Sequence, residues 1–221
     1  MDKAVILLSG GLDSTTTLYL AKNQGYALCA IIFDYNQRHK AEIDFAKKIA
    51  GLNNIEYHLV KIDLSWAKSS LTDDNIEVPH NRNLFYKEIP LTYVSARNII
   101  FLSYAFSLAE SISAKKIFIG AHIQDYSAYP DCRPEFFDGF QKAFNSGMKY
   151  QDIEIVAPLI DKSKKEIIEI GLNLGVPFQH TWSCYQGGEL PCEKCDICRF
   201  RMKAFEELGM KDPILADTKL I

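Results

Sequence analysis

The sequence predicts an α/β fold, a doubly wound parallel sheet with a small zinc-binding segment near its C-terminal end. Short runs of aliphatic and β-branched residues alternate with helical patterns over residues 1–175, and this alternation is typical of a parallel sheet. A glycine-rich turn lies between the first apolar run and the first helix. Four cysteines gather in a tail, residues 176–221, that we expect to pack on the same domain.

The individual elements follow from local patterns. Continuous apolar runs suit strands buried on both faces, and we expect strands at 4–8, 27–33, 55–62, 116–120 and 153–157. Helices are expected at 14–24, 40–50, 95–111, 134–146 and 163–174, with Gly25 and Gly51 ending the first two and Ser95 capping the third. Residues 64–90 are irregular and contain two prolines, so they form a long excursion of the kind that serves as a lid or partner surface.

Composition and charge narrow the functional classes. Apolar residues make up 48% of the 221 residues and charged residues 24%, which is ordinary for a globular protein. The formal net charge of -3 disfavours a nucleic-acid substrate, because phosphate contacts require cations. The N-terminal apolar run is too short to cross a membrane and lacks a cleavage pattern. We therefore expect a cytoplasmic protein with no membrane partner.

The sharpest local motif is a candidate phosphate loop. It comprises Leu8, Ser9, Gly10, Gly11, Leu12, Asp13, Ser14, Thr15 and Thr16. Its two glycines let backbone N–H groups approach an anion, and the following helix start adds unsatisfied donors. Asp13 is a candidate to place Mg²⁺, since a bare carboxylate would otherwise repel phosphates. The Walker and dinucleotide-binding patterns are both absent, and the bland alternative is a Gly-Gly turn before an ordinary helix.

The cysteine cluster predicts a metal site. Cys184, Cys192, Cys195 and Cys198 have the spacing C-x7-C-x2-C-x2-C. Four thiolates supply a closed tetrahedral shell for a structural Zn²⁺. An iron–sulfur cluster, a redox dithiol and disulfides remain as alternatives, although disulfides are rare in a cytosolic chain.

The two motifs together carry a family resemblance. Ser-Gly-Gly-x-Asp-Ser resembles the PP-loop of the ATP pyrophosphatases, and its combination with the four cysteines resembles the 7-cyano-7-deazaguanine synthase family of queuosine biosynthesis. Further matching stretches are 33–39, 93–98, 125–133 and 158–164. Ser95 stands where the family commonly has proline, and Ala128 where glycine is usual. The resemblance spans nearly the whole chain.

This resemblance implies an adenine nucleotide alpha hydrolase-like fold and a homodimeric carbon-nitrogen ligase. Such an enzyme converts 7-carboxy-7-deazaguanine and ammonia to the 7-nitrile, using ATP to form an adenylated carboxylate and then an amide. Asp13, Arg97 and Lys164 are then candidates for catalysis. The last two would be phosphate counter-ions, and the alternative for each is an ordinary surface cation. Candidates for substrate binding are Asp125, Tyr126, Tyr129, Asp131 and Arg133, and Tyr35 and Gln37 are candidates to line the nucleotide pocket.

Two other functions compete with this interpretation. A PP-loop enzyme that adenylates an RNA base should carry a basic face or an added RNA-binding domain. The sequence shows neither clearly, and the candidates for a basic patch are Lys162, Lys164, Lys165, Arg199 and Arg201. A zinc-ribbon binding module with a degenerate loop is a different class, and the intact loop with Asp13 disfavours it.

Overall fold

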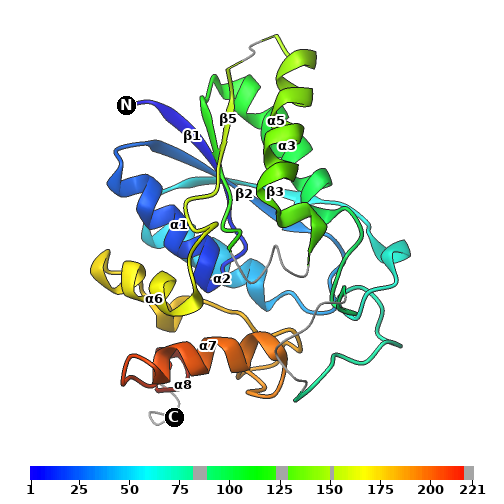
Figure 1. The fold of residues 1–221 in the computed structure, drawn as a ribbon, viewed down its shortest axis with the longest axis vertical. Coiled ribbons are helices and arrows are strands. Elements are labelled where there is room, and N and C mark those ends of the chain that lie inside the picture. Colours follow the sequence, from blue (N-terminus) through cyan, green and yellow to red (C-terminus); the bar gives the residue numbers. More distant parts are fainter. Residues whose placement is uncertain (82–88, 123–128, 150–151, 217–221) are drawn as a thin grey trace.

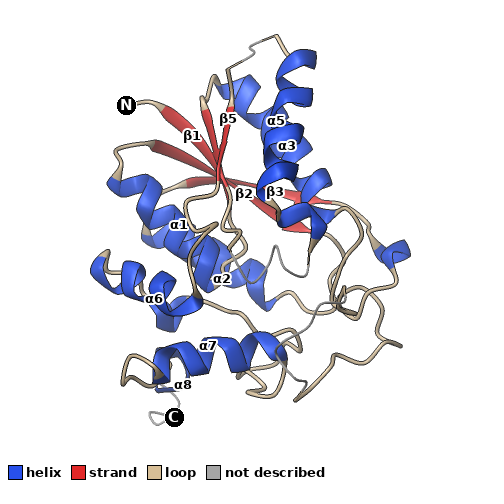
Figure 2. Cartoon of the chain, viewed as in Figure 1, coloured by secondary structure: helices blue, strands red, loops and turns tan. Residues whose placement is uncertain are grey.

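The computed structural model describes residues 1–81, 89–122, 129–149 and 152–216. Its centre is a five-stranded parallel sheet in the order β3-β2-β1-β4-β5 (Figures 1 and 2). The strands are β1 (Lys3–Leu7), β2 (Ala27–Asp34), β3 (Glu56–Lys61), β4 (Lys116–Phe118) and β5 (Glu154–Val156). The predicted fold class is therefore confirmed. The order reverses at β1, which pairs with both β2 and β4, so the first strand supplies the topological switch point of the sheet.

Helices cover both faces of the sheet. α1 (Leu12–Asn23) and α2 (Ala41–Leu52) lie on one face, and α3 (Arg97–Ile112) and α5 (Pro134–Gly147) lie on the other (Figure 1). Beyond α1 follow α6 (Lys164–Asn173), α7 (Asp196–Glu206) and the short α8 (Pro213–Ala216). Among the described residues, no helix has both the length and the apolar character that crossing a membrane requires.

Strand β1 shows why the apolar runs are continuous. Val5 and Leu7 belong to the core shared with α3, whereas Ala4 and Ile6 belong to the core shared with α1 and α2. Successive side chains of a strand point to opposite faces, so a strand covered on both sides has no position for a polar residue. The switch-point strand is thereby fixed rigidly between two cores.

Three details of the sequence prediction need correction or adjustment. Ser95 does not cap α3: the N-cap position is Ala96, with φ 56°, and the Asp131 carboxylate accepts the N–H of Asn98 in the first turn instead. Gly51 does not end α2, which continues to Leu52 before a left-handed turn at Asn54; an exposed helical glycine costs only about 1 kcal/mol, so the helix tolerates it. The other predicted boundaries shift by at most a few residues.

The C-terminal tail packs against the sheet domain rather than standing apart. Phe178 and Phe205 share a buried cluster with Leu12 of α1 and with Ile167 and Ile168 of α6. Two sets of contacts hold the excursion over the described residues 64–81. The Arg38 guanidinium donates to the carbonyls of Asp73 and Ile76. His80 forms an isolated antiparallel β-bridge with Cys195 of the tail. Tail and excursion therefore meet beside the end of the sheet.

Candidate functional site

A cavity of about 260 Å³ opens at the carboxyl ends of the central strands. Its walls come from the loop after β1, the end of β2, the starts of α2 and α3, and the tail at Trp182 and Ser183. Ligands of open parallel sheets bind at this edge, next to the switch point. The residues that line it are both apolar and polar, as in small-molecule sites generally.

The candidate phosphate loop forms the floor of this cavity. Gly10 has φ 75°, and a Cβ there would lie 2.4 Å from the backbone nitrogen of Ala46, so the loop can pack on α2 only with glycine at this position. The hydroxyls of Ser9 and Ser14 lie 3.0 Å apart. No side chain caps α1 at Gly11, which leaves the first N–H groups of the helix available to an anion.

The nine predicted loop residues divide into two groups. Leu8, Ser9, Gly11, Asp13 and Ser14 line the cavity, whereas Gly10, Leu12, Thr15 and Thr16 are not among the described lining residues. Thr15 and Thr16 are fully buried, and the Thr16 hydroxyl donates to the carbonyl of Leu12 within the helix. The hydroxyls of Ser9 and Ser14 therefore face the cavity, and those of the two threonines do not.

Asp13 is bound by a buried lysine. Nζ of Lys164 lies 2.7 and 2.8 Å from the two carboxylate oxygens and 2.8 Å from Nε2 of His122. Burial acts to raise the pKa of Asp13, but the charge of Lys164 offsets it, so the pKa lies below its ordinary value. Lys164 is thus an interior partner of the loop rather than a surface cation. The sequence alone does not indicate a role for His122, because only folding brings it next to Lys164.

Arg97 sits on the opposite wall. Its guanidinium donates to the Tyr35 hydroxyl at 3.2 Å and lies 5.6 Å from the centre of that ring. Burial acts to lower the pKa of Arg97, yet the pKa is raised because Tyr35, Tyr129, Glu42 and Asp131 surround the cation. Burial also raises the pKa of Glu42. Arg97 therefore presents a permanent positive charge to the cavity.

Gln37 connects this wall to α2. It accepts from the backbone N–H of Tyr35 and donates to Glu42 at 2.8 Å, and all three residues line the cavity. Tyr35 and Gln37 are expected from the sequence to line the nucleotide pocket, and both line this cavity. The sequence gives no separate signal for Glu42, which lies in the first turn of a helix.

The predicted substrate residues fall in three places. Tyr129 and Asp131 line the cavity; the Tyr129 hydroxyl lies 2.8 Å from that of Thr92, and Asp131 accepts the N–H of Asn98 at the start of α3. Arg133 is exposed and is not among the described lining residues. Asp125 and Tyr126 lie outside the described residues.

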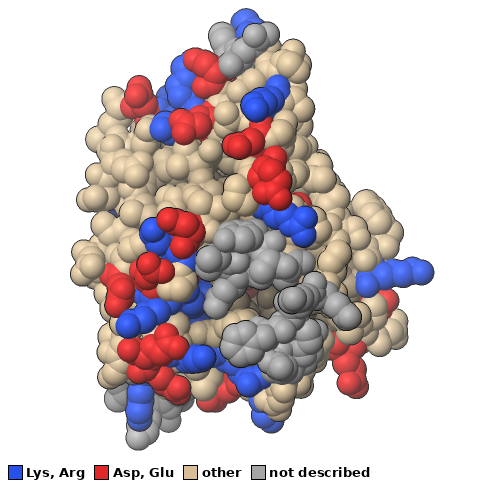
Figure 3. Space-filling view, in the orientation of Figure 1, with Lys and Arg blue, Asp and Glu red and all other residues tan. Residues whose placement is uncertain are grey.

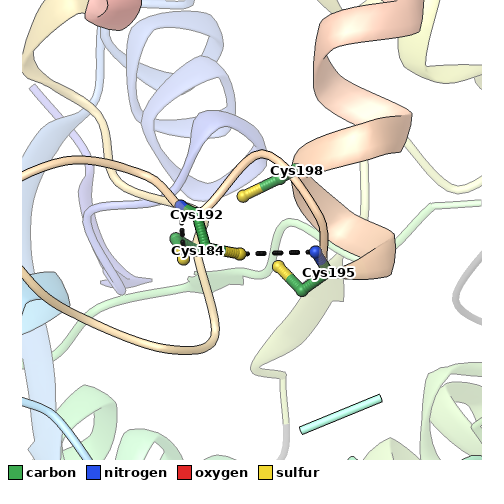
Figure 4. A group of neighbouring side chains, drawn as sticks. All are labelled: Cys184, Cys192, Cys195 and Cys198. Atoms are coloured by element: carbon green, nitrogen blue, oxygen red, sulfur yellow. Dashed lines mark hydrogen bonds between the residues drawn. The ribbon is translucent and has the colours of Figure 1, made fainter. Parts of the chain in front are cut away.

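The four predicted cysteines converge. Their sulfur atoms lie within 4.8 Å of one another, and Figure 4 shows them pointing toward a common centre from two loops and the start of α7. A tetrahedral zinc site with bonds of about 2.3 Å places its sulfurs about 3.8 Å apart. Backbone N–H groups of Cys192 and Cys195 donate to neighbouring sulfurs. The arrangement is compatible with a bound metal.

Trp182 joins this cysteine cluster to the phosphate loop. It packs in the same buried cluster as Cys184, Cys195 and Cys198, and its backbone N–H donates to the carbonyl of Gly10 at 2.8 Å. Its ring also packs against Phe45 of α2, with centroids 5.4 Å apart. The cysteine-bearing tail thus forms one wall of the cavity, a connection that the sequence spacing does not reveal.

Comparison with known proteins identifies the family. The family described as "Queuosine biosynthesis protein QueC" matches residues 3–209. Relatives named 7-cyano-7-deazaguanine synthase include one from Trichodesmium erythraeum, 52% identical over 96% of this chain and 100% of its own, and one from Thermoplasma acidophilum, 50% identical over 96% and 91%. A solved structure, a predicted subunit of tRNA methyltransferase from Methanocaldococcus jannaschii, is 14% identical with a TM-score of 0.53 over 96% of this chain and 90% of that chain, and it supports the fold alone. The predicted resemblance is confirmed, and the chain belongs to the QueC family of queuosine biosynthesis proteins.

Proposed function

We propose that this chain is an ATP-dependent ligase that converts 7-carboxy-7-deazaguanine and ammonia to 7-cyano-7-deazaguanine. The observation that carries the proposal is one cavity in which a phosphate loop faces Arg97, Tyr129 and Asp131, in a chain about half identical to relatives that bear this activity's name. A purine-like ring offers a flat face to an aromatic side chain and donor groups to a carboxylate.

The chemistry requires two activations. The substrate carboxylate attacks the α-phosphorus of ATP, pyrophosphate leaves, and an acyl adenylate forms. Ammonia then attacks the acyl carbon and AMP leaves, giving the amide. The amide oxygen attacks a second ATP in the same way, and loss of AMP with two protons leaves the nitrile. Each activation converts a poor leaving group into a good one.

The phosphate loop is suited to the departing pyrophosphate. Ser9, Ser14, the backbone of Gly11 and the first turn of α1 supply hydrogen-bond donors on the cavity floor. Asp13 is a carboxylate of the type that Mg²⁺ prefers, and it would hold the ion that neutralises the phosphates. Lys164 is not among the described lining residues, but it donates to Asp13 of the loop, and from there it would serve the phosphates as a second cation.

The opposite wall is suited to the deazaguanine. Arg97 is positioned to attract the substrate carboxylate or the transferring phosphate, and Tyr129 and Asp131 to hold the ring. Asp125, Tyr126 and Arg133, from the same stretch of chain, complete the proposed substrate set.

The cysteine cluster would hold Zn²⁺ as a closed structural site, within a tail of residues 176–221 that supports a nucleotide-binding unit of residues 1–175. Reduced thiols for such a site imply a reducing compartment, so we propose a cytoplasmic location.

We further propose a homodimer that acts without nucleic acid. Trp66 is 68% exposed and Leu91 57%, and Ser69 and Ser70 hold Leu91 beside this segment, which gives a second copy an apolar surface. Acidic and basic side chains are interspersed over the described part of the face in Figure 3, which is unlike the basic surface of an RNA-binding protein. Sedimentation of a Trp66→Asp variant tests the dimer.

The decisive test is a substrate-dependent assay. Zinc-loaded protein is mixed with Mg-ATP, ammonium and 7-carboxy-7-deazaguanine, and the products are weighed by mass spectrometry. The proposal requires the nitrile together with two AMP for each nitrile formed. Folded protein that binds ATP but yields no nitrile would contradict it, and transfer RNA would be the next substrate.

A further inference from the structure

The ammonium group of Lys164 is fully occupied. Lys164 begins α6, and its side chain is 4% exposed. Nζ contacts both carboxylate oxygens of Asp13, at 2.7 and 2.8 Å, and Nε2 of His122, at 2.8 Å. An ammonium carries three protons and has no acceptor. Three acceptors therefore match three donors.

This contact fixes the role of His122. Because an ammonium can only donate, Nε2 of His122 accepts, and the ring proton lies on Nδ1. The ring is 2% exposed, and its Nε2 lies 3.7 Å from the nearer Asp13 oxygen, beyond hydrogen-bond distance. The hydrogen-bonded connection between His122 and Asp13 therefore runs through Lys164.

The ion pair sets a condition for nucleotide binding. While Lys164 donates its three protons to Asp13 and His122, the ammonium has none left for a phosphate, whereas the Asp13 oxygens keep lone pairs for a cation. Lys164 is not among the described lining residues of the cavity, so to serve the phosphates of ATP, as proposed above, it must exchange the Asp13 carboxylate for phosphate oxygens. A long lysine side chain that released all its acceptors at once would lose its orientation.

We propose that His122 is a positioning residue, which retains the Lys164 ammonium while its other two donors pass from Asp13 to the phosphates of ATP. This role rests on the proposed function. The support for His122 is rigid, because it follows β4 by way of Gly120, where an added Cβ would lie 2.9 Å from the backbone nitrogen of Ser14. The backbone that carries His122 is thus packed directly on the phosphate loop.

Two variants separate the acceptor from the bulk of the ring. His122→Leu removes the acceptor, and His122→Gln restores one. ATP binding is measured by titration calorimetry on the zinc-loaded protein without the carboxylate substrate, followed by steady-state kinetics. For His122→Leu we expect ATP affinity about 10-fold weaker, from the lost charged hydrogen bond, and kcat about 100-fold lower, from misplacement of Lys164. The KM for the carboxylate stays unchanged, and His122→Gln regains most of both losses.

Three controls complete the test. Ile49→Val, a buried change at the end of α2 far from the cavity, lowers Tm without weakening ATP binding. In a Lys164→Met background, His122→Leu has no further effect on kcat. Nitrogen-15 NMR of the wild-type imidazole finds the proton on Nδ1, a measurement that does not depend on any variant folding.

The proposal is overturned if His122→Leu binds and turns over ATP like the wild type, if His122→Gln is as impaired as His122→Leu, or if the proton lies on Nε2. Because ATP binding is measured without the carboxylate, these results are distinguishable from failure of the proposed function, which would appear as absence of nitrile from the wild-type enzyme.

Discussion

The buried ion pair between Arg201 and Asp212 predicts a large and strongly non-additive loss of stability. Arg201 lies on α7, and its Nε and Nη2 donate to the two Asp212 oxygens at 2.6 and 2.9 Å. Its remaining N–H groups reach the carbonyls of Phe178 and Thr181 and the Thr181 hydroxyl. Both charged side chains are at most 4% exposed. One guanidinium thereby joins three segments of the tail.

Replacing Arg201 with Met leaves the Asp212 carboxylate buried without its cation. Breaking such a pair costs about 3–5 kcal/mol, which lowers the Tm of a chain of this size by about 6–20 °C. Asp212→Leu, which strands the guanidinium, should cost a similar amount. The double variant removes both charges and leaves chiefly unpaired carbonyls, so it should lose only about 1–3 kcal/mol.

Thermal unfolding of the zinc-loaded protein, followed by tryptophan fluorescence, measures these differences. Trp182 is 3% exposed and Trp66 68% exposed, so the change in emission reports mainly on the tail. Lys203→Met on the same helix is the matched control, because its ion pair with Glu207 is long and exposed and should contribute under about 1 kcal/mol. If Arg201→Met were no more destabilised than Lys203→Met, or if the two single losses summed to the double loss, the reasoning from the buried pair would be wrong.

Three further predictions concern the cavity. Gly10→Ala should cost more than about 2 kcal/mol of stability and most of the activity, because the added Cβ would lie 2.4 Å from the backbone of α2. The control Gly25→Ala, at φ 85° with nothing within 4 Å, should cost about 1 kcal/mol and leave activity intact. Equal losses of activity in the two variants would contradict the packing argument. Asp13→Asn should reduce turnover to below about 1% of wild type with the fold retained, as measured by nitrile formation and circular dichroism; persistent turnover would rule out its proposed role. Removing the metal with a chelator should weaken ATP binding about 10-fold, and added Zn²⁺ should restore it, because the metal site orders the tail and Trp182 of the tail donates to Gly10. Unchanged ATP affinity in protein whose four thiols react as free would refute this connection between the cysteine cluster and the phosphate loop.

Much of the fold could be predicted from local patterns. Ala4 to Leu8 are all buried at 8% exposure or less. Burial on both faces requires a continuous apolar run, and this run is the signal that predicts β1. The convergence of the four cysteines could also be predicted, because short spacings bring thiols together almost regardless of the surrounding fold. Helix ends were harder. Ser95 is a good capping residue, but the chain enters α3 through Ala96 in the left-handed conformation. Alanine rarely adopts this conformation, so the local sequence does not predict the turn.

The cavity depended on contacts that sequence patterns do not encode. In the sequence, Glu42 looks like an ordinary residue of the first turn of a helix, yet in the folded chain it lines the cavity. Arg201 and Asp212 look like two of many surface charges until the tail folds over them. The family resemblance supplied candidates such as Arg97 and Lys164, but only the folded chain places Lys164 against Asp13 rather than in solvent.

The separation between Asp13 and Lys164 has a consequence for the newly made protein. The two residues are 151 positions apart, and at about 5–20 residues per second a ribosome needs roughly 8–30 s to make the intervening chain. During that interval the phosphate loop lacks its lysine, and Trp182 has not yet been made to support Gly10. The nascent chain can begin to collapse around β1 and β2, but it cannot complete the nucleotide cavity. Capture of ATP therefore has to wait until synthesis has passed Trp182 and the tail has folded onto the loop.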